Sequence, residues 1–299
     1  MSKLTQTTYP VNRFRKQIIC IGDSMTYNVS YDMTADKYYP HVLQTLLNTE
    51  GYQLVCRNFG RAGNTTGDMI LRKALFTQWG VPDIALIHGS VNDYAQDTTV
   101  AASPSPTTTT FSVATGKGQY YKEGSYLTVV VGGTTYSRLI SSVATDAITI
   151  ETALPSAPAA GAAVMIDTTQ NIVAMADYLT GLGVERFIIC GMGYENLASG
   201  GDTLATPLAA NVTLRAKQAA AAADIGESAT YVDLYTSMRA TLQAQITAGT
   251  NSEGSGSWNQ STTDIHYNSV GSAIIAEIIK DAIIATSELA AAIAVVTDV

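Results

Sequence analysis

The stretch QIICIGDS, residues 17–24, decides the fold that we expect for this chain. It is an unbroken apolar run that ends in a Gly-Asp-Ser turn, and apolar residues then recur three and four positions apart in residues 38–48. A short apolar run is typical of a strand buried on both faces of a parallel sheet, and the spacing that follows is typical of an amphipathic helix. We therefore predict a strand, a turn and a helix here.

The same alternation continues along most of the chain. Further apolar runs lie at residues 52–58, 84–88, 186–190 and 230–234, and helical patterns lie at 66–76, 169–182, 207–223, 235–247 and from 270 onward. Strands that alternate with helices form a parallel sheet with helices on both faces. The sequence therefore predicts an α/β fold with a five-stranded parallel sheet, and it places Asp233 inside the fifth strand as a structural residue.

Residues 98–167 differ from the rest of the chain in composition and in hydrophobic pattern. Ser, Thr, Pro and Gly are frequent, and short alternating runs lie at residues 126–131 and 147–152. Such alternation predicts strands with one buried face. We expect an α/β domain made of residues 1–97 and 168–299, with a β-rich module inserted at 98–167. This module is expected either to bind or select a polymeric substrate, or to act as a spacer or an oligomerisation surface.

The composition excludes some classes of function. The chain has 299 residues, of which 46% are hydrophobic and 14% are charged, and its formal net charge is -8. An acidic chain is a poor partner for nucleic acid, because that affinity rests on clustered Lys and Arg. No apolar run is long enough to cross a membrane, and the N-terminus lacks the apolar core of a signal peptide. We therefore expect neither a nucleic-acid partner nor a membrane partner.

The three cysteines, Cys20, Cys56 and Cys190, each lie in a short apolar stretch. This placement favours buried thiols in a reducing compartment over a disulfide framework. The sequence contains no Cys-x-x-Cys pair and no cluster of Cys with His. Since zinc sites are built from such groups, we expect no bound metal.

Groups suited to acyl transfer follow the first three predicted strands. Ser24 follows the first strand, Gly63 the second and Asn92 the third. Because the carboxyl ends of parallel strands meet at one edge of the sheet, we expect these residues to line one crevice. They supply a hydroxyl nucleophile, a backbone N–H with no side chain in the way, and a side-chain amide donor for an oxyanion.

A serine nucleophile needs a base, which is most often a histidine. Of the three histidines, His266 lies in a polar loop, whereas His41 falls in a predicted helix and His88 at the end of an apolar strand. We therefore predict that His266 is the base and that His88 is a packed, hydrogen-bonded residue. Asp264 is close enough in sequence to orient the ring of His266, as the acid of a triad does.

Four sequence blocks follow one another along the chain: IGDSMT at 21–26, NFGRAGNTT at 58–66, GSVND at 89–93 and DIHYN at 264–268. In this order they resemble the blocks of the SGNH hydrolases, also called GDSL esterases and lipases. The resemblance covers the chain outside the inserted module. It implies a flavodoxin-like α/β/α sandwich, no cofactor, Ser24 as nucleophile and His266 as base. It also implies an oxyanion hole formed by the backbone N–H groups of Ser24 and Gly63 and the side chain of Asn92.

The chain departs from the family pattern at the acid. The family places this residue three positions before the histidine, where this chain has Thr263, and Asp264 lies only two positions before. Two alternatives stay open. Asp264 completes a Ser-His-Asp triad, or a backbone carbonyl holds the ring of His266 in a Ser-His dyad.

Asp23, Asn64 and Tyr27 are the candidates for substrate contacts. Asp23 also suits another role, shared with Asp93, in which the carboxylate fixes loop geometry by accepting backbone hydrogen bonds. A group of tyrosines follows the nucleophile, and its members either wall a substrate cleft or cover the edge of the sheet. These tyrosines are Tyr27, Tyr31, Tyr38 and Tyr39.

These features predict a serine esterase that hydrolyses short-chain acyl esters, acetyl esters in particular, with a small ester or an acylated carbohydrate as its partner. One alternative is a lipase or thioesterase that acts on longer acyl chains. Another is a catalytically weak, glycan-binding virion component, because residues 110–155 resemble small β modules of phage virion proteins. The expected location is therefore the cytoplasm or a phage particle.

Overall fold

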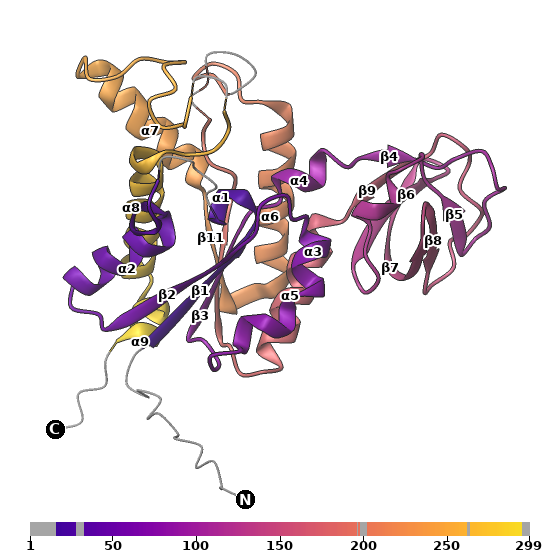
Figure 1. Cartoon of the computed structure of the whole chain (residues 1–299), viewed down its shortest axis with the longest axis horizontal. Helices are drawn as coiled ribbons and strands as arrows, with labels where there is room; N and C mark the ends of the chain where they lie inside the picture. The colour runs from indigo at the N-terminus through magenta and orange to yellow at the C-terminus, as the bar shows by residue number, and fades with distance from the viewer. Residues whose placement is uncertain (1–15, 28–32, 196, 198–201, 262–263, 295–299) are drawn as a thin grey trace, which may run out of the picture.

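A computed structural model of the chain describes residues 16–27, 33–195, 197, 202–261 and 264–294. Its main sheet has five parallel strands in the order β11-β10-β3-β1-β2 (Figure 1). The strands are β1 (Lys16–Gly22), β2 (Leu54–Gly60), β3 (Ile84–His88), β10 (Arg186–Cys190) and β11 (Ala229–Val232). Read from β2, this is the flavodoxin-like order of a doubly wound sheet. The predicted fold class is confirmed.

The inner strand β1 is apolar from Ile18 to Ile21 because both of its faces are covered there. Ile18 and Cys20 belong to the hydrophobic cluster on one side of the sheet, and Ile19 and Ile21 belong to the cluster on the other side. All four side chains are completely buried. Since side chains alternate between the two faces of a strand, an unbroken apolar run is what a central parallel strand requires.

Helices form the two outer layers of the sandwich (Figure 1). One face is covered by α2 (Tyr39–Thr49), α7 (Leu234–Thr247), α8 (Ser269–Ala285) and α9 (Ser287–Ile293). The other face is covered by α3 (Thr66–Leu71), α5 (Thr168–Thr180) and α6 (Ala209–Ile225). Two one-turn helices, α1 (Ser24–Tyr27) and α4 (Val91–Tyr94), follow the carboxyl ends of β1 and β3.

Several predicted boundaries are wrong. β2 begins and ends two residues later than residues 52–58, and the helix predicted at 66–76 is divided at Arg72 into α3 and a 3-10 helix at Lys73–Thr77. The C-terminal helix predicted from residue 270 is divided at Thr286, whose backbone is extended. Asp233 lies outside the fifth strand, because β11 ends at Val232 and the Asp233 carboxylate instead caps the N-terminus of α7.

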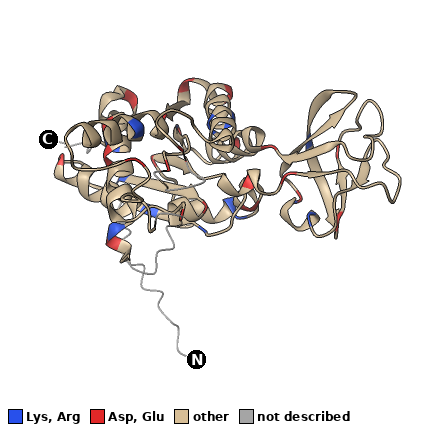
Figure 2. Cartoon of the chain, turned by 90° about the horizontal axis from the view of Figure 1, so that it is seen from above, with Lys and Arg blue, Asp and Glu red and all other residues tan. Residues whose placement is uncertain are grey.

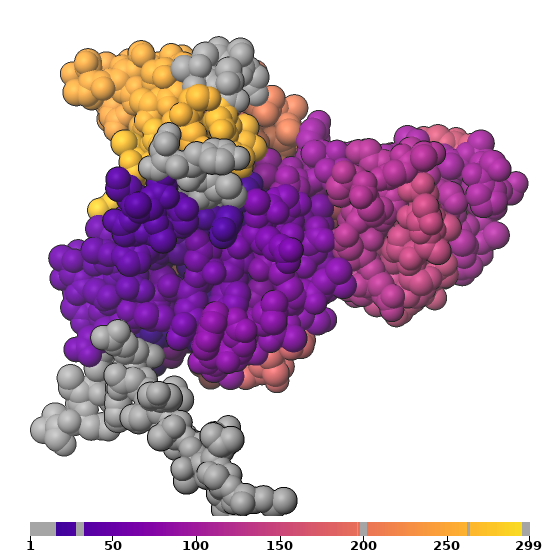
Figure 3. Space-filling model, in the orientation of Figure 1, coloured from indigo at the N-terminus to yellow at the C-terminus, as the bar shows by residue number. Residues whose placement is uncertain are grey.

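A second sheet lies within residues 98–167, and it has six strands in the order β4-β9-β6-β7-β8-β5. They are β4 (Thr98–Thr99), β5 (Thr110–Ser112), β6 (Tyr126–Val131), β7 (Thr134–Ala144), β8 (Ala147–Ile150) and β9 (Ala163–Ile166). An antiparallel bridge between Val100 and Val113 joins the two outer strands and closes the sheet on itself. The interior has its own apolar cluster, and Figure 3 shows the sheet as a lobe beside the sandwich.

Charged side chains are scattered over the sandwich, with Lys and Arg interspersed among Asp and Glu (Figure 2). In the described part of the chain, no helix has both the length and the hydropathy needed to cross a bilayer. The three cysteines are free thiols, with Cys20 and Cys190 buried and Cys56 partly exposed. Two of the three predicted buried thiols are therefore confirmed.

Candidate active site

Ser24 lies at a sharp turn between β1 and α1. The turn depends on Gly22, because a Cβ atom there would lie 1.9 Å from the carbonyl oxygen of His88 and 2.2 Å from Oγ1 of Thr26. Only glycine lets the end of β1 approach β3 this closely. The Ser24 residue begins α1 and is 7% exposed. The close pairing of the two strand ends therefore places Ser24 at the carboxyl edge of the sheet, beside the loop that follows β3.

The carboxylate of Asp23 ties the loop of Ser24 to the loop that follows β3. Its Oδ1 accepts a hydrogen bond of 2.8 Å from the backbone N–H of Met25, and its Oδ2 accepts bonds of 2.8 Å from Ser90 and 3.2 Å from Val91. The side chain is completely buried. These contacts agree with the loop-fixing role for Asp23 and not with direct substrate binding.

Asn92 lies in α4 and Gly63 lies in the loop after β2, and a hydrogen bond joins these two segments. Nδ2 of Asn92 donates to the carbonyl oxygen of Asn64 over 3.0 Å, and the amide retains a second N–H for another acceptor. Gly63 has a φ of 74°, a conformation that favours glycine, and no atom would lie within 4 Å of a Cβ there. The structure therefore joins two of the three predicted oxyanion donors, with open space beside Gly63. The Oδ1 atom of Asn64 is buried and has no hydrogen-bond partner among the described residues.

The structure brings Asp264 and His266 together. Nδ1 of His266 lies 2.7 Å from Oδ1 of Asp264, and the same oxygen accepts the backbone N–H of His266 over 2.9 Å. Oδ1 of Asp264 thus contacts both the backbone N–H and the ring of His266. This turn lets an acid two positions before the histidine reach the imidazole. This geometry favours the triad over the dyad, because it is the contact that orients a catalytic imidazole.

The loop of His266 is fixed on both sides. The backbone N–H of Gln260 donates to the carbonyl oxygen of His266 over 2.9 Å, and Asn268 caps the N-terminus of α8 by accepting from Val270 and Gly271. Among the described residues, no hydrogen bond joins Ser24 to His266. The structure thus assembles the acid with the base, and separately the nucleophile loop with the oxyanion loops.

His88 is packed as predicted, but the hydrogen bonds expected for it are absent among the described residues. Both ring nitrogens are buried without a hydrogen-bond partner, and the ring meets Tyr39 edge-on at 5.4 Å between centroids. Burial lowers the pKa of His88 to about 4. The predicted hydrogen-bonded state is therefore wrong, because the apolar face of β3 offers this ring an aromatic neighbour instead of polar ones.

The tyrosines near the nucleophile have different surroundings. Tyr27, at the end of α1, is 46% exposed and available to a ligand. Tyr39 is buried, and the hydroxyl of the half-buried Tyr38 donates to the carbonyl oxygen of Met33. Tyr31 lies outside the described residues. Of the four, Tyr27 alone is described with a freely accessible ring.

Arg72 is a residue of the site that the sequence reasoning missed. Its Nη1 donates to the carbonyl oxygen of Phe59 over 2.6 Å, and its Nη2 donates to that of Gly22 over 2.9 Å. These carbonyls lie at the carboxyl ends of β2 and β1, so the guanidinium clamps the two strands just before the loops of Gly63 and Ser24. An arginine inside a predicted helix carries no local signal of such a role.

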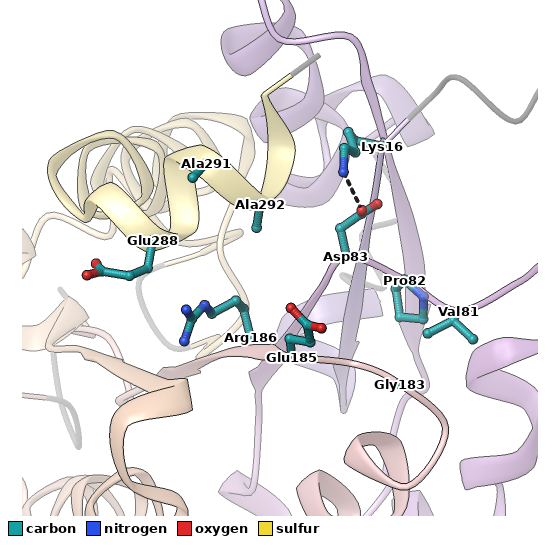
Figure 4. A pocket seen from close by; sticks show the side chains of 10 residues that line it. All are labelled: Lys16, Val81, Pro82, Asp83, Gly183, Glu185, Arg186, Glu288, Ala291 and Ala292. Carbon is teal, nitrogen blue, oxygen red and sulfur yellow. Dashed lines mark hydrogen bonds and ion pairs between the residues drawn. The ribbon is translucent and has the colours of Figure 1, made fainter. Parts of the chain in front are cut away.

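The large cavity in Figure 4 lies elsewhere. Its volume is about 510 Å³, and its charged lining includes Lys16, Asp83, Arg186 and Glu288. Lys16 begins β1 and Arg186 begins β10, so the cavity lies at the amino ends of the strands. Ser24 follows the opposite, carboxyl end of β1. The described residues contain no group of three or more His, Cys, Asp or Glu suited to a metal ion.

Burial raises the pKa values of Asp23 and Asp93 to about 6. Because these values exceed the ordinary value of 3.8, the protonated carboxyls favour the folded state, and this stabilisation is lost as the pH rises from about 4 through about 6. We expect Asp93→Asn, which mimics the protonated group, to remove on the order of 2 kcal/mol of this pH dependence. Chemical denaturation at pH 4 to 7 measures it, and equal pH slopes for both proteins would contradict the prediction.

Comparison with known proteins places this chain in a family. The model of the GDSL-like lipase/acylhydrolase family matches residues 20–274, a range that contains all the candidate residues described above. No curated protein sequence matches the chain.

Solved structures are similar at low identity. A GDSL-like protein from Parabacteroides merdae ATCC 43184 has a TM-score of 0.50 at 14% identity, with 90% of this chain and 96% of that chain covered. A lipase/acylhydrolase from Enterococcus faecalis has a TM-score of 0.49 at 15% identity over 90% and 95% of the two chains. The acetyl xylan esterase AlAXEase has a TM-score of 0.49 at 16% identity over 89% and 99%. At these identities, structural likeness concerns the fold alone. The family match over most of the chain goes further: this protein belongs to the GDSL-like lipase/acylhydrolase family.

Proposed function

We propose that this protein is a serine esterase that removes short acyl groups, acetyl in particular, from a polar ester such as an acylated carbohydrate. The observation that carries the proposal is the 2.7 Å contact between Nδ1 of His266 and the Asp264 carboxylate. This contact leaves Nε2 of the same ring as the atom that takes the proton of a serine. Family membership and the turn at Ser24 supply the nucleophile that such a base serves.

The reaction begins when His266 takes the proton of Ser24 and the serine oxygen attacks the ester carbonyl. The oxyanion is stabilised by the backbone N–H groups of Ser24 and Gly63 and by the amide of Asn92. The carbonyl re-forms, the C–O bond to the alcohol breaks, and His266 returns the proton to the leaving alcohol. Water, deprotonated by His266, then hydrolyses the acyl-enzyme and restores Ser24. Asp264 stabilises the imidazolium in both halves.

A short acyl group and a polar alcohol suit the described surroundings of these residues. In the loop between β2 and α3, Arg61, Ala62 and Gly63 are exposed, and none of them offers a long apolar side chain. Two exposed tyrosines end the short helices of the site, Tyr27 in α1 and Tyr94 in α4, each 46% exposed. Rings of this kind give a sugar an apolar face and a hydroxyl.

The acyl preference is tested with p-nitrophenyl acetate, butyrate and octanoate, together with an acetylated polysaccharide. We expect kcat/KM for acetate to exceed that for octanoate by at least about 10-fold, because each misfit methylene costs on the order of 1 kcal/mol. We also expect acetate release from the polysaccharide. Preference for octanoate would instead support the lipase or thioesterase alternative. Absence of all hydrolysis, with binding of the polysaccharide, would support the glycan-binding alternative.

A further inference from the structure

The residue after the oxyanion donor Asn92 is a buried carboxylate that collects hydrogen bonds from two helices. Oδ1 of Asp93 accepts the backbone N–H of Thr66 over 2.8 Å. Oδ2 accepts the hydroxyl of Thr66 over 2.7 Å and that of Thr168 over 2.8 Å. Thr66 begins α3 and Thr168 begins α5. Asp93 therefore fastens the one-turn helix that carries Asn92 to the starts of both helices.

The same junction fixes the loop of the second oxyanion donor. Thr66 lies three positions after Gly63, and Asn92 donates to the carbonyl oxygen of Asn64 in the same loop. The Asn92 helix and the Gly63 loop are thus joined twice, once through Asn92 and once through Asp93. A shift of Asp93 would change the position of the Asn92 amide relative to the N–H of Gly63.

The second sheet enters this network at the point where the chain returns to the sandwich. β9 ends at Ile166, and Thr168 follows two residues later. One turn further along α5, Nδ2 of Asn171 donates to the hydroxyl of Thr66 over 3.1 Å, and its Oδ1 accepts the backbone N–H of Tyr126 in β6 over 2.7 Å. Thr66, Asp93, Thr168 and Asn171 are all buried. An unbroken chain of hydrogen bonds therefore runs from β6 to the Asn92 helix.

We propose that Thr168 and Asn171 are positioning residues through which the second sheet fixes the oxyanion donors, acting by way of Asp93 and Thr66 on the Asn92 amide. The proposal rests on the proposed esterase function and adds a role for the six-stranded sheet in it. Neither residue touches the substrate in this role. Their effect is on where the amide lies when the oxyanion forms, because donors placed about 1 Å away from the productive geometry can cost on the order of 10²-fold in rate.

Thr168→Val tests the proposal, with Thr168→Ser as the matched control. Valine keeps the shape of threonine and removes the hydroxyl that reaches Asp93, whereas serine keeps the hydroxyl. We expect Thr168→Val to lower kcat for p-nitrophenyl acetate by about 10-fold with KM changed less than about 2-fold, since the loss affects the transition state. We expect Thr168→Ser to stay within about 2-fold of the wild type.

A double-mutant cycle separates positioning from general damage. Asn92→Ala alone is expected to lower kcat by about 10²- to 10³-fold, as the loss of one oxyanion donor does. If Thr168 acts through Asn92, adding Thr168→Val to Asn92→Ala should lower kcat by less than about 2-fold more. A full second 10-fold loss in the double mutant, or equal kcat for Thr168→Val and Thr168→Ser, would overturn the proposal.

If Thr168→Val fails to fold, Asn171→Ala replaces it in the cycle with Asn92→Ala, and the Thr168 hydroxyl stays in place. The same outcomes for kcat then support or overturn the proposal. The activity of the wild type distinguishes failure of the proposed esterase function from failure of the positioning role. If the wild type hydrolyses none of the esters, the proposed function fails. If it is active and the Thr168 variants are equal, the positioning role alone fails.

Discussion

Replacement of Ser24 by Ala is expected to reduce hydrolysis of p-nitrophenyl acetate by on the order of 10⁴- to 10⁶-fold, because the acyl-enzyme can no longer form. Ser24 is small and its hydroxyl makes no hydrogen bond that the fold depends on among the described residues, so the melting temperature should change little. Initial rates of purified wild type and variant, with circular dichroism of both, measure the two effects.

Ser137→Ala is the matched control for this change. Ser137 is an exposed residue of β7 in the second sheet, so the same substitution there should leave kcat/KM unchanged. A fluorophosphonate reagent adds an independent measurement, since it should label the wild type at Ser24 and leave Ser24→Ala unlabelled. Unchanged turnover by Ser24→Ala would show that another group is the nucleophile and would refute the mechanism.

Asp264→Asn is expected to lower kcat by on the order of 10³- to 10⁴-fold. The carboxylate accepts from Nδ1 of His266 and thereby leaves Nε2 free to take the serine proton, whereas an amide also offers a donor to Nδ1 and favours the wrong tautomer. The pH profile of kcat/KM, measured beside the wild type, shows the effect on the base, and circular dichroism of both proteins shows whether the fold is kept.

Asp233→Asn is the matched control for Asp264→Asn, because Asp233 also accepts hydrogen bonds from a residue nearby in the sequence. The carboxylate of Asp233 caps α7 through Thr236, and the residue is not part of the site. We expect its substitution to change kcat less than about 2-fold, with some loss of stability from the weakened cap. A loss below about 10-fold for Asp264→Asn would mean that His266 is held without the acid, as in a dyad.

The strands of the sandwich could be predicted from the sequence because their signal is local. β3 and β10 each contain four consecutive apolar residues between turn residues, and their bounds agree with the prediction. The sequence also predicted that Ser24, Gly63 and Asn92 lie at one edge of the sheet. Each follows a strand, and parallel strands have their carboxyl ends at the same edge. One predicted helix was wrong at Arg72, where α3 ends and where the side chain donates to the ends of β1 and β2.

The sequence by itself determined the fold class, the number of strands in the main sheet, and which segments carry the candidate nucleophile, oxyanion donors and base. The contacts between those loops were decided only by the tertiary structure. Sequence spacing left open whether Asp264 reaches His266, and nothing local linked Asp93 to Thr168 or joined Val100 to Val113 to close the second sheet. The physical reason is that periodicity reports which face of one element is buried, whereas a hydrogen bond between residues far apart in the chain depends on how several elements pack together.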